Sequence, residues 1–256
     1  MQIGSRPPRI PLIQQLEVSV SSPGNGATKV IDISQPIYGG MPVFPGHLGT
    51  TVFEHHSHAD TLGKFESDLS YATKGIIVSD HGPTHVDSFS HFDPAEGAAA
   101  IDEMSLDLFW GEGTCIDISS TPPQEYCTAE GMDAALAASG AELNPGDVLL
   151  IHTGNFEKNG GTDDYLSQYP GLDESAGDWL VAKKVKVFGI DTPSPDNPIS
   201  RTYPIHLMCR REHITHYEHL ANLKGLIGKR FTFVGMPLKI TGGHGSPVRA
   251  VAYLSE

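Results

Sequence analysis

Residues 81–92 read His-Gly-Pro-Thr-His-Val-Asp-Ser-Phe-Ser-His-Phe, the stretch around which the rest of the chain is organised. Its chemically active groups, His81, His85, Asp87 and His91, all fall on odd positions. Side chains of an extended segment alternate between two faces, so these four would project to one side. A helix would carry Asp87 away from the two preceding histidines, and the Gly-Pro pair disfavours helix there.

Two imidazoles and a carboxylate that converge on one point form a ligand set for Zn²⁺ or Mn²⁺. Coordination positions left to water are what a catalytic metal requires. The alternative is an exposed strand edge with incidental histidines, and the matched parity of three histidines argues against it. The preceding Ile76-Ile77-Val78 reads as a buried strand that delivers the motif, with a bend at Pro83.

Composition limits the classes of protein. With 256 residues, 39% of them hydrophobic, residues 1–256 are expected to form one domain with residues 1–28 as an N-terminal extension. The formal charge of −14 and only 17 scattered Lys and Arg disfavour nucleic-acid and membrane partners and favour a small-molecule substrate.

Targeting signals and cysteines add two further expectations. No signal-peptide core and no long apolar run is present, which predicts a soluble cytoplasmic protein. Cys115, Cys127 and Cys209 lack C-x-x-C spacing, so neither a disulfide framework nor a thiolate zinc site is indicated.

Strand and helix patterns alternate along the chain and predict an α/β fold with a mixed, partly parallel central sheet flanked by helices. The apolar and β-branched runs predict strands at 29–34, 113–118, 147–153, 186–190, 230–235 and 248–254. Periodicity and capping signals predict helices at 102–110, 128–139 and 175–183.

Two other histidine groups are not expected to bind metal. Residues 55, 56 and 58 lie on a strand whose adjacent histidines face opposite ways, and the polar 59–70 segment after them is a candidate lid loop. Residues 213, 216 and 219 keep one face of neither a helix nor a strand. In the Pro- and Gly-rich loop 35–46, Phe44 is equally compatible with a pocket wall and with the core.

The chain resembles the metal-dependent cyclase/hydrolase family that includes bacterial kynurenine formamidase and isatin hydrolase. The family motif H-x-G-T-H-x-D-x-P-x-H is answered by His81, Thr84, His85, Asp87 and His91, although Pro83 and Phe89 depart from it. Four more landmarks follow the family order: Asp32-Ile-Ser with Phe44-Pro-Gly46, Gly146-Asp-Val-Leu-Leu, Gly189-Ile-Asp-Thr-Pro-Ser194 and Gly245-Ser-Pro-Val-Arg-Ala250.

The resemblance implies roles for individual residues. His81, His85 and Asp87 would bind the metal, and His91 would be the acid/base. His206 and Glu218 match the spacing of a second metal site that Asp87 bridges, so one or two Zn²⁺ or Mn²⁺ ions per chain are expected. The resemblance also implies a swivelling β/β/α domain and a homodimer or homotetramer.

The reaction expected is metal-assisted hydrolysis of an amide C–N bond in a small aromatic substrate, either an aryl formamide or a cyclic amide. His91 would move the proton from water to the leaving nitrogen. Ser246, in a Gly-rich turn, is a candidate substrate ligand, with a plain turn residue as the alternative. The competing hypotheses are a lactone hydrolase, a ring-closing cyclase and a non-catalytic metal-binding scaffold. The presence of His91, which metal binding does not need, argues against the scaffold.

Overall fold

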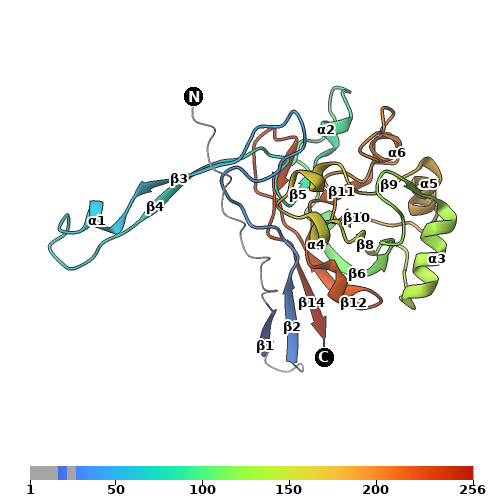
Figure 1. Cartoon of the computed structure of the whole chain (residues 1–256), viewed down its shortest axis with the longest axis horizontal. Coiled ribbons are helices and arrows are strands. Elements are labelled where there is room, and N and C mark those ends of the chain that lie inside the picture. The colour runs from blue at the N-terminus through green and yellow to red at the C-terminus, as the bar shows by residue number, and fades with distance from the viewer. Residues whose placement is uncertain (1–16, 22–26, 256) are drawn as a thin grey trace.

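A ten-stranded mixed sheet organises the computed structural model, which describes residues 17–21 and 27–255 (Figure 1). Its strands lie in the order β1 (Glu17–Ser21), β2 (Ala27–Asp32), β14 (Val251–Ser255), β12 (Arg230–Val234), β6 (Trp110–Asp117), β8 (Val148–His152), β10 (Val187–Ile190), β11 (Thr215–Glu218), β5 (His85–Asp87) and β13 (Gly245–Pro247). The four from β6 to β11 are parallel and the outer ones pair antiparallel. The expected α/β fold with a mixed sheet is therefore confirmed.

Helices and several short elements complete the described fold. The α-helices are α1 (His58–Thr61), α2 (Phe89–Phe92), α3 (Ala129–Ser139), α4 (Asn155–Asn159), α5 (Glu174–Ala182) and α6 (Pro204–Glu212). The 3-10 helices are η1 (Leu106–Phe109), η2 (Asp163–Leu166) and η3 (Leu223–Leu226), and two small sheets pair β3 (Thr51–His56) with β4 (Thr73–Ile77) and β7 (Tyr126–Cys127) with β9 (Gly171–Leu172). Helix was predicted over 102–110, but η1 is one short turn and strand β6 begins at Trp110.

Strand β8 shows why the centre of the sheet is parallel. All five of its residues are buried, so the run of apolar residues has cover on both faces. Val148 and Leu150 belong to one core cluster, whereas Leu149 and Ile151 belong to the other. The second cluster lies against α3, α5 and α6, which Figure 1 shows together on one side of the sheet.

Helix α3 illustrates how local sequence sets an element. The Thr128 hydroxyl accepts a hydrogen bond from the Gly131 backbone N–H and begins the helix. Gly140, with φ of 64°, ends it in the left-handed conformation. The prediction of a helix over 128–139 is confirmed to within one residue.

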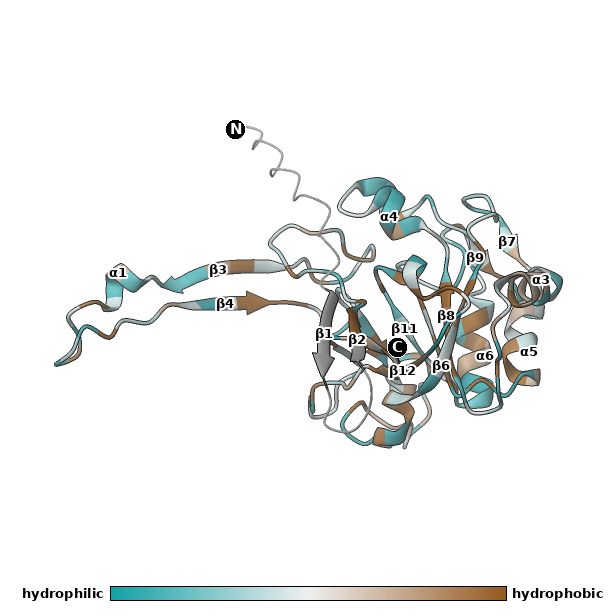
Figure 2. Ribbon diagram, turned by 90° about the horizontal axis from the view of Figure 1, so that it is seen from below, coloured by the Kyte–Doolittle hydropathy of each residue, from teal (hydrophilic) through white to brown (hydrophobic). Residues whose placement is uncertain are grey.

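Strands β3 and β4 form an arm that projects from the body of the molecule, with α1 near its far end (Figures 1 and 2). The prediction of a buried strand at 76–78 is wrong, because Ile76 is 57% and Ile77 is 49% exposed. In the described part of the chain β4 pairs only with β3, and no second layer of these residues covers it. The candidate lid segment 59–70 forms the far end of this arm.

The N-terminal extension takes part in the main sheet. β1 pairs antiparallel with β2, and β2 begins at Ala27, before the predicted strand start. Residues 1–16 and 22–26 lie outside the described part of the chain. Within the described residues, no helix is both long enough and apolar enough to cross a membrane.

Candidate metal centre

Strand β5 presents two of the predicted ligands on one face. His85 and Asp87 are two residues apart on β5, and His81 lies in the turn just before it, next to a cis peptide bond at Gly82-Pro83. The Nε2 atoms of His81 and His85 each lie 3.3 Å from Oδ1 of Asp87. The backbone of β5 is fixed between β11 and β13.

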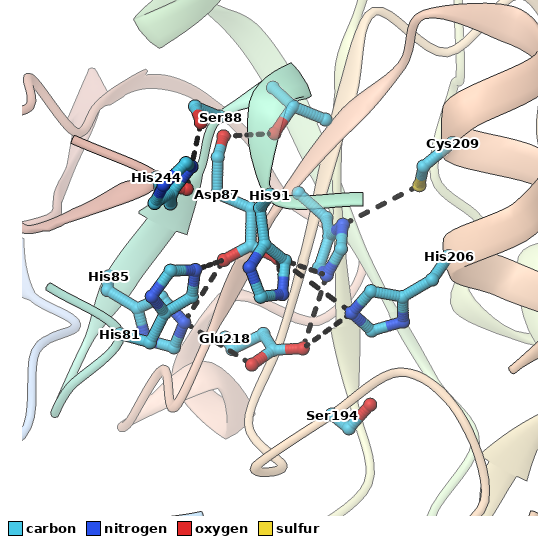
Figure 3. Close-up of polar contacts among 12 residues, drawn as sticks. His81, His85, Asp87, Ser88, His91, Ser194, His206, Cys209, Glu218 and His244 are labelled. Atoms are coloured by element: carbon cyan, nitrogen blue, oxygen red, sulfur yellow. Dashed lines mark hydrogen bonds and ion pairs between the residues drawn. The ribbon is translucent and has the colours of Figure 1, made fainter. Parts of the chain in front are cut away.

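His91 reaches the same point because the chain turns after Asp87. In a straight strand its ring would lie about 13 Å beyond Asp87. Instead, residues 89–92 form the helical turn α2, which brings Nε2 of His91 to 3.8 Å from Oδ2 of Asp87 and its ring centroid to 4.0 Å from that of His81. Figure 3 shows both rings beside the Asp87 carboxylate.

The downstream pair arrives from two other elements. His206 lies on α6, and its Nε2 is 3.8 Å from Oδ2 of Asp87 and 3.9 Å from Oε1 of Glu218. Glu218 ends β11, where it stands opposite His85 in the β5–β11 pairing. Its Oε2 lies 3.3 Å from Nε2 of His85. The two carboxylates therefore stand between the His81–His85 side and the His206 side of the centre (Figure 3).

Asp196 holds His206 in this position. Its Oδ2 accepts a hydrogen bond of 2.5 Å from Nδ1–H of His206 and one of 3.2 Å from the backbone N–H of the same residue. Its Oδ1 accepts a hydrogen bond from the backbone N–H of Ile205, which is one of the N–H groups in the first turn of α6 that have no partner within the helix. Nε2 of His206 is consequently left to face the centre with its lone pair available.

The donor atoms fit a metal ion. Nε2 of His81, Nε2 of His85 and both carboxylate oxygens of Asp87 are buried without a hydrogen-bond partner among the described residues. Buried polar atoms normally have partners, so four such atoms at one point fit the coordination of a cation. Ligands about 2.0–2.1 Å from a tetrahedral ion lie about 3.3–3.4 Å apart, which matches the 3.3 Å that separates Oδ1 of Asp87 from Nε2 of His81 and from Nε2 of His85.

The carboxylates and imidazoles shift one another's ionisation. Burial tends to lower the pKa of His85, but the adjacent carboxylates of Asp87 and Glu218 raise it to about 10. Burial opposes ionisation of both carboxyls as well, yet the surrounding imidazoles hold the pKa of each well below its usual range. Burial lowers the pKa of His91 to about 4, so its ring is neutral near pH 7 and can accept a proton.

A pocket opens beside the centre and includes Phe44. One cavity of about 270 Å³ is lined by aromatic and polar side chains and by residues of the candidate metal centre. Its lining consists of Phe44, His47, His81, His91, Phe92, Pro193, Ser194, Tyr203, His206 and Glu218. An adjoining cavity of about 320 Å³ shares His47, His81 and His91 with it. The structure thus places Phe44 at a pocket wall, with its ring 5.4 Å from that of His47.

Ser246 has a different place. Its side chain is fully buried on β13, where its hydroxyl donates to the Pro247 carbonyl and accepts the Leu238 backbone N–H. Both hydrogen-bonding capacities are therefore used inside the protein. That Ser246 binds substrate stays a prediction, and the structure places the residue on a buried strand where a turn was expected.

Two histidines that the sequence interpretation set aside also face the centre. His216 and Glu218 occupy alternate positions of β11, so they share one face, and Nε2 of His216 is 3.2 Å from Oε1 of Glu218. His219 follows with φ of 56°, and its buried ring lies 5.7 Å from that of His85. The His-x-Glu spacing on a strand was the signal for His216. By contrast, His213 is exposed at the end of α6.

Known proteins are similar to this chain in sequence. The Cyclase family model ("Putative cyclase") matches residues 31–197. Curated kynurenine formamidases from Geobacillus thermodenitrificans (strain NG80-2) and Bordetella pertussis (strain Tohama I) are each 30% identical, with 86% of this chain and 95% of each relative covered.

Solved structures share the fold. Isatin hydrolase A from Labrenzia aggregata bound to benzyl benzoate superposes with a TM-score of 0.77 at 22% identity and covers 90% of this chain and 94% of that chain. An isatin hydrolase bound to the product analogue thioisatinate gives a TM-score of 0.78 at 22% identity, with 90% and 93% covered.

Proposed function

This chain belongs to the Cyclase family, and from that premise we propose that it is a metal-dependent hydrolase of amide C–N bonds in small aromatic substrates. The observation that carries the proposal is the Asp87 carboxylate, which is fully buried and whose two oxygens find no hydrogen-bond partner in the described part of the chain. Histidines surround it, and a pocket opens beside it. A buried anion so placed is well suited to hold a cation.

His81, His85 and Asp87 would hold one ion, and His206 and Glu218 would take part in holding a second, of Zn²⁺ or Mn²⁺. When bound, such an ion supplies Lewis acidity, which makes water nucleophilic near neutral pH and polarises a substrate carbonyl. His91 borders both parts of the pocket and is neutral, so it accepts the proton of the attacking water. The same imidazole then delivers that proton to the leaving nitrogen.

The pocket supports a small substrate with an aromatic ring. Phe44, Phe92 and Tyr203 line the smaller cavity, and aromatic walls favour contact with a flat ring. An aryl formamide, as in kynurenine formamidase, and a cyclic amide, as in isatin hydrolase, both combine such a ring with a carbonyl that must reach the centre. We propose that the substrates belong to one of these two classes, aryl formamides or cyclic amides.

The test compares three bond types on one metal-loaded preparation. N-formylkynurenine, isatin and an aromatic lactone would be assayed side by side, with and without a chelator. We expect hydrolysis of at least one amide, loss of that activity with the chelator and recovery when Zn²⁺ or Mn²⁺ is added back. Hydrolysis of the lactone alone would refute the amide assignment in favour of a lactone hydrolase.

We further propose that the arm formed by β3 and β4 binds a second copy of the chain. An isolated two-stranded hairpin is marginally stable in water, and this one exposes Phe53, Ile76 and Ile77 to the extent of 48%, 57% and 49%. Figure 2 shows hydrophobic stretches on both of its strands. Since every copy carries the same arm, a two-fold pair would cover both apolar surfaces at once.

Light scattering with gel filtration tests the arm. A Phe53→Ser/Ile76→Ser variant should shift the molecule from twice the monomer mass to the monomer mass. The control is Leu106→Ser, which removes an apolar side chain that is 64% exposed but lies on η1, outside the arm. This variant should leave the mass unchanged. A wild type that is monomeric at assay concentration refutes the pairing.

A further inference from the structure

We propose that His216 is a direct ligand of the second metal ion and completes a closed set of four protein donors with Asp87, His206 and Glu218. This inference rests on the proposed metal-dependent function and goes beyond it. The family landmarks supply His206 and Glu218 but do not include His216. The resulting ion would have no coordination position left for water, in contrast to the ion held by His81, His85 and Asp87.

Distances place the four donor atoms around one point. Nε2 of His216 lies 3.2 Å from Oε1 of Glu218 and 3.5 Å from Oδ2 of Asp87. Nε2 of His206 lies 3.9 Å and 3.8 Å from the same two oxygens. One ligand atom from each of the four residues lies within 4.8 Å of the other three. Tetrahedral zinc ligands are about 3.3–3.4 Å apart, so small movements of these side chains would suffice.

The environment of His216 fixes the plane of its ring. The side chain has no exposed surface, and its ring stacks at 14° on Phe188 and at 17° on Phe92, with centroids 5.2 Å and 6.4 Å away. The perpendicular ring of His206 stands 5.0 Å away at 85°. Two aromatic faces thus hold the imidazole edge toward the carboxylates, which reduces the entropy lost on binding an ion.

The other ring nitrogen has a partner that suits metal binding. Nδ1 of His216 lies 3.5 Å from Sγ of Cys209 on α6. Cys209 is fully buried, so water does not compete for this contact. If Nδ1–H donates to this sulfur, the lone pair of Nε2 faces the carboxylates. Ligating histidines are commonly oriented in this way by a partner at the second nitrogen.

A purely structural alternative has the same heavy-atom positions. The Cys209 thiol would donate to Nδ1, and Nε2–H of His216 would donate to Oε1 of Glu218. The ring would then be a hydrogen-bond donor and would bind no ion. The two arrangements differ in the number of imidazole nitrogens that contact metal, and that number can be measured.

The first experiment uses wild-type protein labelled with ¹⁵N-histidine. Apo protein would be titrated with Zn²⁺ to saturation while the ring nitrogen resonances are followed. We expect four imidazoles to bind zinc, namely His81, His85, His206 and His216. Three zinc-bound imidazoles at saturation, with two zinc ions per chain, would overturn the proposal without touching the proposed hydrolase activity.

The second experiment uses matched variants and zinc affinity as the readout. His216→Gln should weaken binding of the second ion by more than ~100-fold, which exceeds the loss typical for a residue that only orients a ligand. His213→Asn is the control, because His213 is exposed and asparagine tolerates its left-handed backbone, φ of 54°. Unchanged affinity in a folded His216→Gln protein would refute direct ligation, and a wild type that binds no zinc would refute both proposals.

Discussion

Replacing His91 with alanine should abolish catalysis while leaving the metal ions bound. His91 lines both cavities beside the centre, and its side chain is 28% exposed, whereas those of His81 and His85 are 7% and 1% exposed. Its ring therefore lies where water and substrate would enter. Removal of a general acid/base typically lowers the rate by ~10²–10⁴-fold, which is about 2.7–5.5 kcal/mol of transition-state stabilisation.

The structure also predicts that the lost function can be restored from solution. The His91 side chain is 28% exposed and borders a cavity of about 320 Å³, so truncation leaves a space that is open to solvent. Added imidazole should enter it and recover part of the activity of His91→Ala. The fold should be little affected for the same reason, since a partly exposed ring contributes less to stability than a fully buried one.

The assay measures kcat and metal content on one preparation. His244→Ala is the control, because His244 lines the same cavity but its Nδ1 interacts with the Ser90 hydroxyl at 3.0 Å. That variant should keep near-wild-type activity. A His91→Ala protein that loses metal as His85→Ala does would make His91 a ligand, and one that keeps most of its activity would remove it from the mechanism.

Three further predictions concern other parts of the molecule. Asp196→Asn weakens the charged partner of His206, so zinc affinity measured by competition with a chelator should fall by ~10–100-fold. Charges and hydrogen bonds from Glu157, Asp191 and Asp117 outweigh burial and raise the pKa of His152 to about 9. Protonated His152 therefore stabilises the fold fully below its usual pKa of about 6.5, and this contribution is lost as the pH rises through 9. Urea unfolding measures the difference in unfolding free energy between wild type and His152→Gln, and this difference should shrink from pH 6 to pH 9. The upper limit of the change is ~3 kcal/mol, and the observed change should be smaller because Asp117 and Glu157 are partly solvated. An increase of the difference would refute the prediction. Leu149→Ala, in the fully buried β8, should cost ~2–5 kcal/mol in the same measurement, and a loss below ~1 kcal/mol would mean that the core closes over the cavity.

Local sequence was sufficient where one element determines the outcome. The two-residue spacing of His85 and Asp87 requires that they share a face of β5 in any extended conformation. The continuous apolar run of β8 requires cover on both sides, and the Thr128 and Gly140 caps set the ends of α3 within the chain itself. These properties depend on backbone period and on hydrogen bonds between near neighbours.

The tertiary structure decided what surrounds each element. The two-residue repeat of a strand predicts on which face His216 and Ile76 project. It does not predict which residues, or solvent, that face contacts. β11 pairs with β5, so residues more than a hundred positions apart meet at Asp87, and His216 points into the centre. Among the described strands β4 pairs only with β3, so Ile76 and Ile77 stand exposed on an arm. Strand order follows from the packing of the whole sheet, and this non-local choice made Glu218 and His216 neighbours of β5 and left Ile76 in solvent.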